Sequence, residues 1–275
     1  MAKRSGTVGF SKYRKHPAAL SVILFLGLIV TSGVYTLGAN AANEYARSSV
    51  DAAAIMNDPA SIDAGKRLFA TGCATCHGLN AQGNSDGPTL IGVGAASVHF
   101  QVSSGRMPMA SPGAQVMRKK PQYTEEQTLQ LAAYVASLSP GPEIPTAAQL
   151  NWAGADLAEG AELFRANCAQ CHSFSGRGGA LTEGKYAPSL MIATPQQIYE
   201  AMITGPQAMP IFNDQTLNLE EKHGIIAYIE YLKDSPNPGG FELGRYGPVT
   251  EGLFLWTIGM GALLMVAIWI GVKAK

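Results

Sequence analysis

The sequence predicts an all-α protein in which two copies of one small helical domain follow each other between two apolar segments. Three observations support this prediction: a motif-bearing stretch recurs at an offset of 95 residues (Gly65 to Gly160), apolar residues around it recur at helical spacing, and the 47% hydrophobic residues concentrate at the two chain ends. The 275 residues suffice for two small domains plus extra segments. With 20 basic and 20 acidic residues, the chain carries no strong field that would favour nucleic acid as a partner.

The first apolar segment covers residues 18–39 and follows a basic flank at residues 1–17. At 1.5 Å per residue such a helix measures about 33 Å, enough to cross a hydrocarbon core of roughly 30 Å. A cleaved signal peptide is the alternative, with Ala39-Asn40-Ala41 as a small-residue cleavage site. Because the apolar run exceeds the roughly 7–15 residues of a signal core, we expect a retained anchor.

The second apolar segment, residues 252–272, is uncharged and has Trp256 and Trp269 near its ends, as membrane-spanning helices often do. A buried core helix is the alternative. Basic residues precede the first segment and follow the second (Lys3, Arg4, Lys12, Arg14, Lys15, Lys273 and Lys275), and an excess of positive charge is typical of cytoplasmic flanks. We therefore expect a multi-pass protein of the cell membrane, with both termini in the cytoplasm and about residues 43–250 on the outer, periplasmic face.

The repeat has four paired parts. GKRLFATGCATCHG from Gly65 matches GAELFRANCAQCHS from Gly160, GPTL (87–90) matches APSL (187–190), and each half then has a Met-Pro pair and an apolar helix-like run. These pairs place domain 1 at residues 60–138 and domain 2 at residues 151–235. A proline-rich linker at residues 139–150 separates the domains, and a Pro/Gly-rich linker at residues 236–250 separates domain 2 from the second apolar segment.

All four cysteines lie in two Cys-x-x-Cys-His motifs: Cys73, Cys76 and His77 in domain 1, and Cys168, Cys171 and His172 in domain 2. This pattern is typical of covalent haem c attachment, in which the thiols bind the haem vinyl groups and the histidine binds the iron. Disulfides, a zinc ribbon and a thioredoxin-like redox pair are the alternatives. Disulfides need no histidine after each pair, zinc-ribbon pairs are typically about 15–20 residues apart, and the redox pair needs a βαβ context. The sequence therefore predicts two covalently bound haem c groups.

With these motifs, each half resembles a class I cytochrome c domain, and the resemblance covers most of residues 60–235. It implies that Pro88 and Pro188 accept hydrogen bonds from the proximal histidines, and that Met107 and Met209, each followed by proline, are the distal iron ligands. Met109 stays open as a rival of Met107, and a core role is the alternative for Met209. A histidine and a methionine on each iron leave no position for a substrate, so we expect electron transfer and no catalytic site.

The whole chain, with two such domains in tandem before a C-terminal span, resembles the dihaem cytochrome cc subunit of actinobacterial menaquinol–cytochrome c reductases, which are cytochrome bc complexes. The resemblance implies an electron-transfer subunit that assembles with cytochrome b and Rieske iron–sulfur subunits. It also implies that electrons pass from the Rieske protein to an aa-type haem-copper cytochrome c oxidase in aerobic respiration. Two alternatives stay open: a cytochrome subunit of another membrane or periplasmic dehydrogenase or oxidase, and a dihaem peroxidase.

Two further polar features lie outside the motifs. His99 precedes Met107 by eight residues, and we expect its ring to bond to the backbone and not to iron. Arg118, Lys119 and Lys120 form a short basic run, which we expect to be solvent-exposed. A docking patch for an acidic partner is the alternative for this run.

Overall fold

The computed structural model describes residues 21, 23–32, 51–111, 113–235, 243–245 and 247–274. The chain divides into two units, Met1–Asp51 and Ala52–Lys275. In the first unit the described residues 23–32 form an exposed apolar helix, Ile23–Ser32. The rest of the expected span at 18–39 and the basic flank at 1–17 lie outside the described residues, apart from residue 21, so the span remains a prediction.

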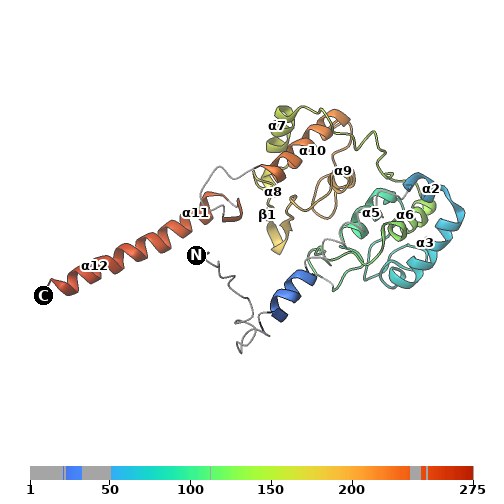
Figure 1. The fold of residues 1–275 in the computed structure, drawn as a ribbon. Helices are drawn as coiled ribbons and strands as arrows, with labels where there is room; N and C mark the ends of the chain where they lie inside the picture. Colours follow the sequence, from blue (N-terminus) through green and yellow to red (C-terminus); the bar gives the residue numbers. More distant parts are fainter. Residues whose placement is uncertain are drawn as a thin grey trace, which may run out of the picture. The chain divides into compact units, whose positions relative to one another are not determined.

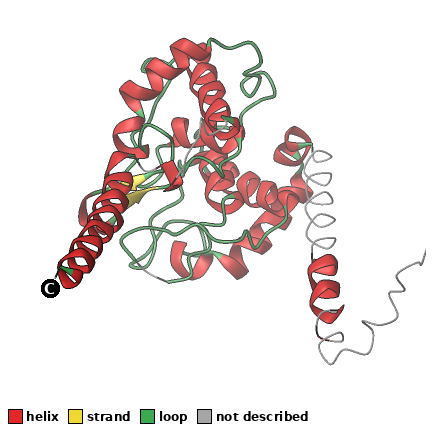
Figure 2. Cartoon of the chain, turned by 60° about the vertical axis from the view of Figure 1, so that its left-hand side comes forward, coloured by secondary structure: helices red, strands yellow, loops and turns green. Residues whose placement is uncertain are grey.

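Helices dominate the second unit, as expected for an all-α protein (Figure 2). Domain 1 contains five helices: α2 (Ala52–Asn57), α3 (Pro59–Gly72), α4 (Ala74–His77), α5 (Gly94–Ser103) and α6 (Glu125–Leu138). Side chains fix where the longer helices begin. Asp58 accepts hydrogen bonds from the first free backbone amides of α3, and Thr124 forms a reciprocal capping box with Gln127 at the start of α6.

Domain 2 repeats the order of α3 to α6, with α7 (Leu157–Asn167), α8 (Ala169–His172), α9 (Pro195–Thr204) and α10 (Leu219–Asp234). Its helices begin at caps of the same kind: Asp156 caps α7, and Thr194 and Asn218 form capping boxes at α9 and α10. The helices of each domain lie together in Figure 1. Among the described residues, the predicted duplication therefore appears as two sets of four helices in the same order, with α2 as an additional helix before the first set.

In each domain the helix before the cysteine motif packs closely against the last helix of the domain. Gly65 on α3 lies so near α6 that a Cβ there would stand 1.9 Å from the carbonyl oxygen of Gln130. Gly160 on α7 lies equally close to α10, because a Cβ at Gly160 would stand 2.0 Å from the carbonyl oxygen of Gly224. One turn further along, a tilted aromatic pair stabilises each crossing, with centroids 5.2 Å apart for Phe69–Tyr134 and 5.3 Å for Phe164–Tyr228.

Because only glycine fits at this crossing, Gly160→Ala is expected to destabilise domain 2 by about 3 kcal/mol, the upper part of the range for overpacking a core. The clash is with backbone, so α7 and α10 must move apart to relieve it. Thermal unfolding of the purified protein, followed by circular dichroism, measures the effect. Gly252→Ala is the control, because a Cβ at Gly252 meets nothing within 4 Å. An equal loss in both variants would contradict the close crossing.

Domain 2 also contains a small hairpin that the sequence did not predict. Strands β1 (Gly179–Ala180) and β2 (Tyr186–Ala187) pair antiparallel around a short 3₁₀ turn, η2 (Thr182–Gly184). Gly178 has φ of +90°, and a Cβ there would stand 2.3 Å from the carbonyl oxygen of Ala187. Two-residue strands are too short to produce a visible alternation of apolar and polar residues, so the pattern gave no signal for them.

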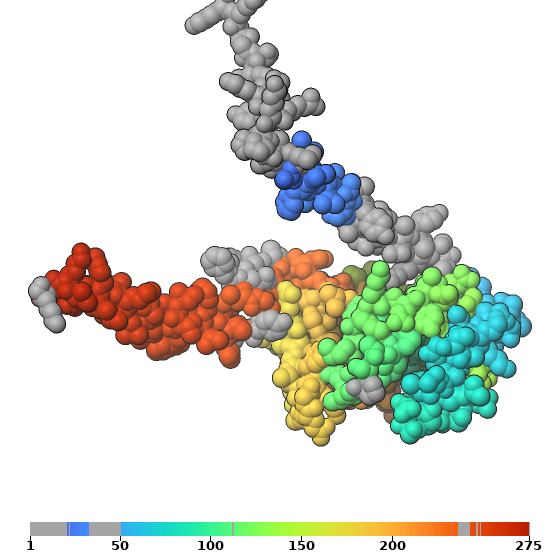
Figure 3. Space-filling model, turned by 90° about the horizontal axis from the view of Figure 1, so that it is seen from below, coloured from blue at the N-terminus to red at the C-terminus, as the bar shows by residue number. Residues whose placement is uncertain are grey.

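The two domains contact each other through α5 and α9 and through the loop that follows Met107. The Gln115 side chain bonds to both backbone groups of Tyr186: its Nε2 donates to the carbonyl oxygen at 2.6 Å, and its Oε1 accepts from the amide at 2.8 Å. The Val116 amide donates to Gln207 Oε1 at 3.0 Å. Figure 3 shows green residues of domain 1 directly against yellow residues of domain 2.

The C-terminal segment begins with η3 (Leu243–Arg245) and continues from residue 248 as α11 (Pro248–Phe254), η4 (Leu255–Met260) and α12 (Gly261–Lys273). The stretch Val249–Lys273 has 25 residues, and its most apolar part has a mean hydropathy of 2.2. No residue of that part is buried. Among the described residues it is the one helix long and apolar enough to cross a membrane. It contains the whole segment 252–272 that the sequence predicts as a span, whereas most of the expected linker at 236–250 lies outside the described residues.

Candidate functional site

Each cysteine motif forms a short helical turn at the end of the preceding helix. The Cys73 amide donates to the Phe69 carbonyl at 2.8 Å, which ends α3, and the His77 amide donates to the Cys73 carbonyl at 3.0 Å, which closes α4. Domain 2 repeats both bonds, from Cys168 and from His172, each at 2.8 Å. In each motif the first cysteine is partly buried and the second is exposed. The turn thus presents two thiols and one imidazole from five consecutive residues.

Both motif histidines are buried and oriented by a proline carbonyl. His77 Nδ1 lies 2.8 Å from the Pro88 carbonyl oxygen, and His172 Nδ1 lies 2.9 Å from that of Pro188. A carbonyl only accepts, so Nδ1 carries the proton and Nε2 keeps its lone pair. Within the described residues neither Nε2 makes a hydrogen bond. Burial lowers the pKa of His172, against the opposing effect of the Pro188 bond, and this favours the neutral imidazole that binds metals.

The methionines of the Met-Pro pairs pack against the same core clusters as the first motif cysteines of their own domains. Met107 and Cys73 pack against one core cluster, which contains Phe69, Ala74, Ala81, Val102, Leu131, Tyr134 and Val135. Met209 and Cys168 pack against the other, which contains Phe164, Ile198, Tyr199, Met202, Phe212, Leu217, Ile225, Ile226 and Ile229. Met109 packs against neither cluster. In each domain the structure therefore places the first motif cysteine and the paired methionine against one core cluster.

The thiols do not fit a redox-active dithiol. Burial raises the pKa of Cys73 to about 11 and that of Cys168 to about 12, and the second cysteine of each motif adds to the shift. Reactive dithiols have a lowered pKa, because the thiolate is the nucleophile. Two thiols and a buried imidazole whose Nε2 makes no hydrogen bond, all within one short turn, fit the chemistry of haem c. The cysteines would hold its vinyl carbons and the histidine would bind its iron.

Lys119 is a site residue that the sequence analysis misjudged, because we expected its basic run to be solvent-exposed. It is partly buried, and its Nζ donates to the carbonyl oxygens of Gly105 (3.2 Å), Arg106 (3.5 Å) and Pro108. These carbonyls surround Met107, so the ammonium clamps the backbone of the methionine loop. Arg118 is also partly buried, whereas Lys120 is exposed as expected.

Lys119→Met is expected to loosen the Met107 loop, because it removes the charged donor that the three carbonyls share. The loss is expected to be about 2 kcal/mol, the usual size for hydrogen bonds to a charged group. Denaturant titration of the weak absorption band that methionine ligation gives ferric haem measures it. The exposed neighbour provides the control, Lys120→Met. Equal midpoints for the wild type and both variants would show that the clamp does not hold the loop.

His99 was also judged wrongly. It does not bond to backbone: its two ring nitrogens lie within hydrogen-bond distance of the carboxylates of Glu125 and Glu200. The expectation failed because Glu200 belongs to the other domain, 101 residues further along the chain. No local pattern indicates such a neighbour.

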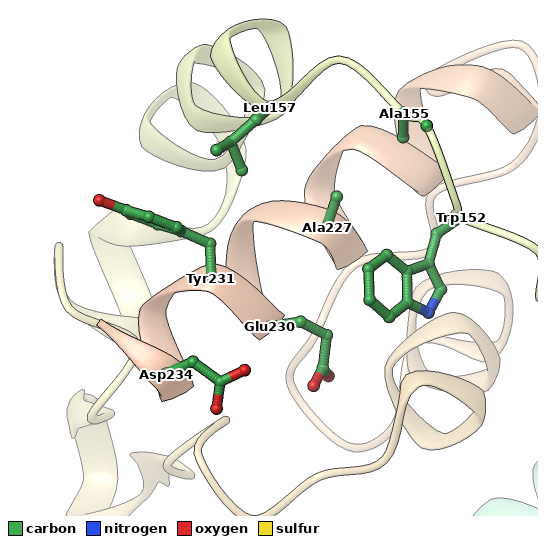
Figure 4. A pocket seen from close by; sticks show the side chains of 8 residues that line it. Trp152, Ala155, Leu157, Ala227, Glu230, Tyr231 and Asp234 are labelled. Atoms are coloured by element: carbon green, nitrogen blue, oxygen red, sulfur yellow. The ribbon is translucent and has the colours of Figure 1, made fainter. Parts of the chain in front are cut away.

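The pocket shown in Figure 4 lies apart from both motifs. It has a volume of about 360 Å³ and lies between α10 and the segment that leads into α7, with Trp152, Leu157 and Tyr231 among its apolar lining residues. None of the motif cysteines, histidines or paired methionines lines it. It therefore has no part in the site described above.

The helical fold and the two motif sites define a c-type cytochrome with two cytochrome c domains. Two family profiles match it: cytochrome c over residues 62–139, and cytochrome c oxidase, cbb3-type, subunit III over residues 155–229. The cytochrome bc1 complex cytochrome c subunit of Corynebacterium efficiens is 51% identical over 238 residues, covering 81% of this chain and 80% of the relative. That of Mycobacterium leprae is 49% identical over 216 residues, covering 76% and 75%. The chain belongs to the family of cytochrome bc1 complex cytochrome c subunits.

A more distant similarity covers about half of the chain. The CcoP subunit of a cbb3-type cytochrome c oxidase from Rubrivivax gelatinosus is 34% identical over 136 residues, covering 47% of this chain and 40% of the relative. This similarity agrees with the profile matched by domain 2. The family gives the chain an electron-transfer role as a cytochrome c, and two cytochrome c domains imply covalently bound haem c.

Proposed function

We propose that the chain binds two haem c groups, one in each domain. Cys73 and Cys76 hold the first, with His77 and Met107 as its iron ligands. The second is held by Cys168 and Cys171, with His172 and Met209 as its iron ligands. The main supporting observation is that both domains orient the motif histidine through a proline carbonyl and leave Nε2 without a hydrogen bond. In each domain the first motif cysteine and the paired methionine also pack against one core cluster.

The residues of the site suit electron transfer and no bond chemistry. Haem c, when bound, takes up and releases one electron at its iron. The motif histidine and the paired methionine would both be ligands of the iron, and no position would then be left for a substrate. Pro88 and Pro188 keep each imidazole in one tautomer and one orientation, which limits rearrangement when the charge at the site changes. Methionine as the distal ligand raises the reduction potential.

In the membrane, we propose that this chain is the electron-transfer subunit of a quinol–cytochrome c oxidoreductase, beside cytochrome b and a Rieske iron–sulfur protein. Val249–Lys273 anchors it, and the residues 18–39 form a second, retained span. The basic flanks favour cytoplasmic termini and haem domains on the outer face. One haem then receives electrons from the Rieske protein and the other delivers them to an aa-type haem-copper oxidase. The names of the relatives at 49–51% identity support the place of this chain in a cytochrome bc1 complex.

The similarity to an oxidase subunit favours a second candidate, in which the chain delivers electrons as part of an oxidase. Gentle purification from the native membrane separates the two. A pyridine haemochrome spectrum with two haems c per chain, together with cytochrome b and Rieske subunits in the preparation, supports the first. Oxidase subunits without cytochrome b support the second. Absence of covalent haem would overturn both.

A further inference from the structure

A buried cluster of three ionisable groups joins the two domains. His99 on α5 of domain 1 is 3% exposed, and Glu200 on α9 of domain 2 is fully buried. His99 Nδ1 lies 2.7 Å from Glu200 Oε1, and its Nε2 lies 2.8 Å from Oε1 of Glu125, at the start of α6. The imidazole therefore bridges a carboxylate of its own domain and one of the other domain.

Neutral side chains complete the contact between α5 and α9. Gln196 Nε2 donates to Glu200 Oε1 at 3.0 Å, which orients the carboxylate from its own helix. Nearby, Gln197 Nε2 donates to Ser103 Oγ at 3.3 Å across the domain boundary. Polar groups that are buried and mutually satisfied have few alternative arrangements, because any shift leaves one of them unpaired.

The charges in this cluster depend on one another. Burial lowers the pKa of His99, but the hydrogen bonds and charges of Glu125 and Glu200 outweigh it and raise the pKa to about 9. Burial raises the pKa of Glu200, against the opposing bond and charge of His99. Glu125 on α6 and Glu200 on α9 are the charged groups that act on the imidazole. The two carboxylates that raise the pKa of His99 therefore come from both domains.

The two helices in contact are those that lead into the methionine loops. Helix α5 ends at Ser103, four residues before Met107, and the Met107 amide donates to Gln101 on α5 at 2.9 Å. Helix α9 ends at Thr204, five residues before Met209, and the Phe212 amide donates to the Met202 carbonyl on α9 at 2.7 Å. A displacement of α5 against α9 therefore moves one methionine loop relative to the other.

We infer that His99 and Glu200 are positioning residues for electron transfer between the two haems, because their ion pair fixes the separation of the two domains. This inference rests on the proposed binding of one haem in each domain. A buried ion pair is a poor source of stability, since apolar residues of the same volume often stabilise as well or better. Its distinctive effect is to specify one arrangement of the two domains. Separating His99 from Glu200 would leave a buried charge uncompensated, so only the docked arrangement satisfies both side chains.

The test uses the purified full-length chain and the variants His99→Gln, Glu200→Gln and the double variant. Each single change is expected to shift the equilibrium between docked and separated domains by about 100-fold or more, the size of effect seen when one partner of a buried pair is removed. Pulsed electron paramagnetic resonance reports this as a broadened inter-haem distance, and flash-induced kinetics reports it as slower transfer between the haems. In the double variant, the docking equilibrium is expected to shift by less than the two single-variant shifts combined, because the two residues interact directly.

The control is His223→Gln, because His223 Nε2 bonds to the Gln149 carbonyl at 2.9 Å and lies outside the α5–α9 contact. Haem content and both reduction potentials are expected to stay unchanged in all variants, whereas a general loss of structure would move them. Unchanged inter-haem distance and transfer in variants that carry two haems would overturn the inference alone. A wild type that lacks a haem would overturn the proposed function instead.

The pH dependence gives an independent readout. The folded pKa of His99, about 9, lies above the ordinary value of 6.5, so its contribution is fully present below about pH 6.5 and is lost as the pH rises through about 9. The inter-haem distance of the wild type is therefore expected to broaden over this range, whereas that of His99→Gln stays broad throughout. A wild-type distance that is the same at pH 6.5 and pH 10 would contradict the role of this pair.

Discussion

A chain with Cys168→Ala and Cys171→Ala is expected to retain the haem of domain 1 and to lose that of domain 2. Both thiols of the second motif are then absent, so only the axial ligands remain to hold the cofactor. The pyridine haemochrome spectrum is expected to fall from two haems c per chain to about one, the proportion that two equivalent attachment motifs require. Quinol-driven reduction of the oxidase is expected to be lost, because the path between the two partners then lacks one of its two electron carriers.

The reciprocal variant, Cys73→Ala with Cys76→Ala, is the matched control. It removes the other haem and leaves domain 2 loaded, so the two variants assign the two sets of spectral bands to their domains. Domain 1 is expected to keep its fold in the first variant, because its core cluster contains residues of domain 1 alone. Two haems per chain in either variant would show that attachment does not use these cysteines.

Met209→Ala is expected to keep the second haem attached and to lower its reduction potential. The thioethers and His172 are unaffected, but the iron loses the methionine that favours its reduced state. We expect a fall on the order of 0.1 V, a modest part of the roughly 0.8 V range that axial ligands span. Redox titration of the purified complex measures the change, and binding of an added small ligand to the opened position gives a second readout.

Ile211→Ala in the same loop is the control, since Ile211 is 58% exposed and packs against neither core cluster. Its potential is expected to match that of the wild type. An unchanged titration of Met209→Ala would mean that another residue is the ligand. Parallel redox titrations of Met107→Ala and Met109→Ala identify the methionine ligand in domain 1. We expect only Met107→Ala to lower the reduction potential of the first haem.

Most features that could be predicted from the sequence depend on residues that are close together along the chain. The cysteine motifs, the Gly and Phe positions before them and the closing apolar run recur at matched spacing, so the duplication and the helical order follow from the chain itself. The bonds from His77 to Pro88 and from His172 to Pro188 span only 11 and 16 residues and accompany a motif of known geometry. Such short-range relations are readable because the residues that interact are close in sequence.

Contacts between the domains were not readable in this way. His99 and Glu200 are 101 residues apart, and Gln115 and Tyr186 are 71 apart. Neither pair belongs to a repeated motif, since the duplication describes each domain separately and says nothing of how one packs on the other. The expectation for Lys119 was wrong for a related reason. Three basic residues in a row usually indicate a solvated surface, and only the fold shows that Lys119 is partly buried against the Met107 loop.

The hairpin of domain 2 depends on domain 1 for two of its hydrogen bonds, and this affects domain 2 as an isolated fragment. Tyr186 offers its amide and carbonyl to the Gln115 side chain, so a primary amide from domain 1 takes the place of a third strand. A fragment cut at the linker would leave this edge uncovered next to the carbonyl that orients His172. Retaining the loop around Gln115, or supplying it as a peptide, would keep the excised domain closer to its native state.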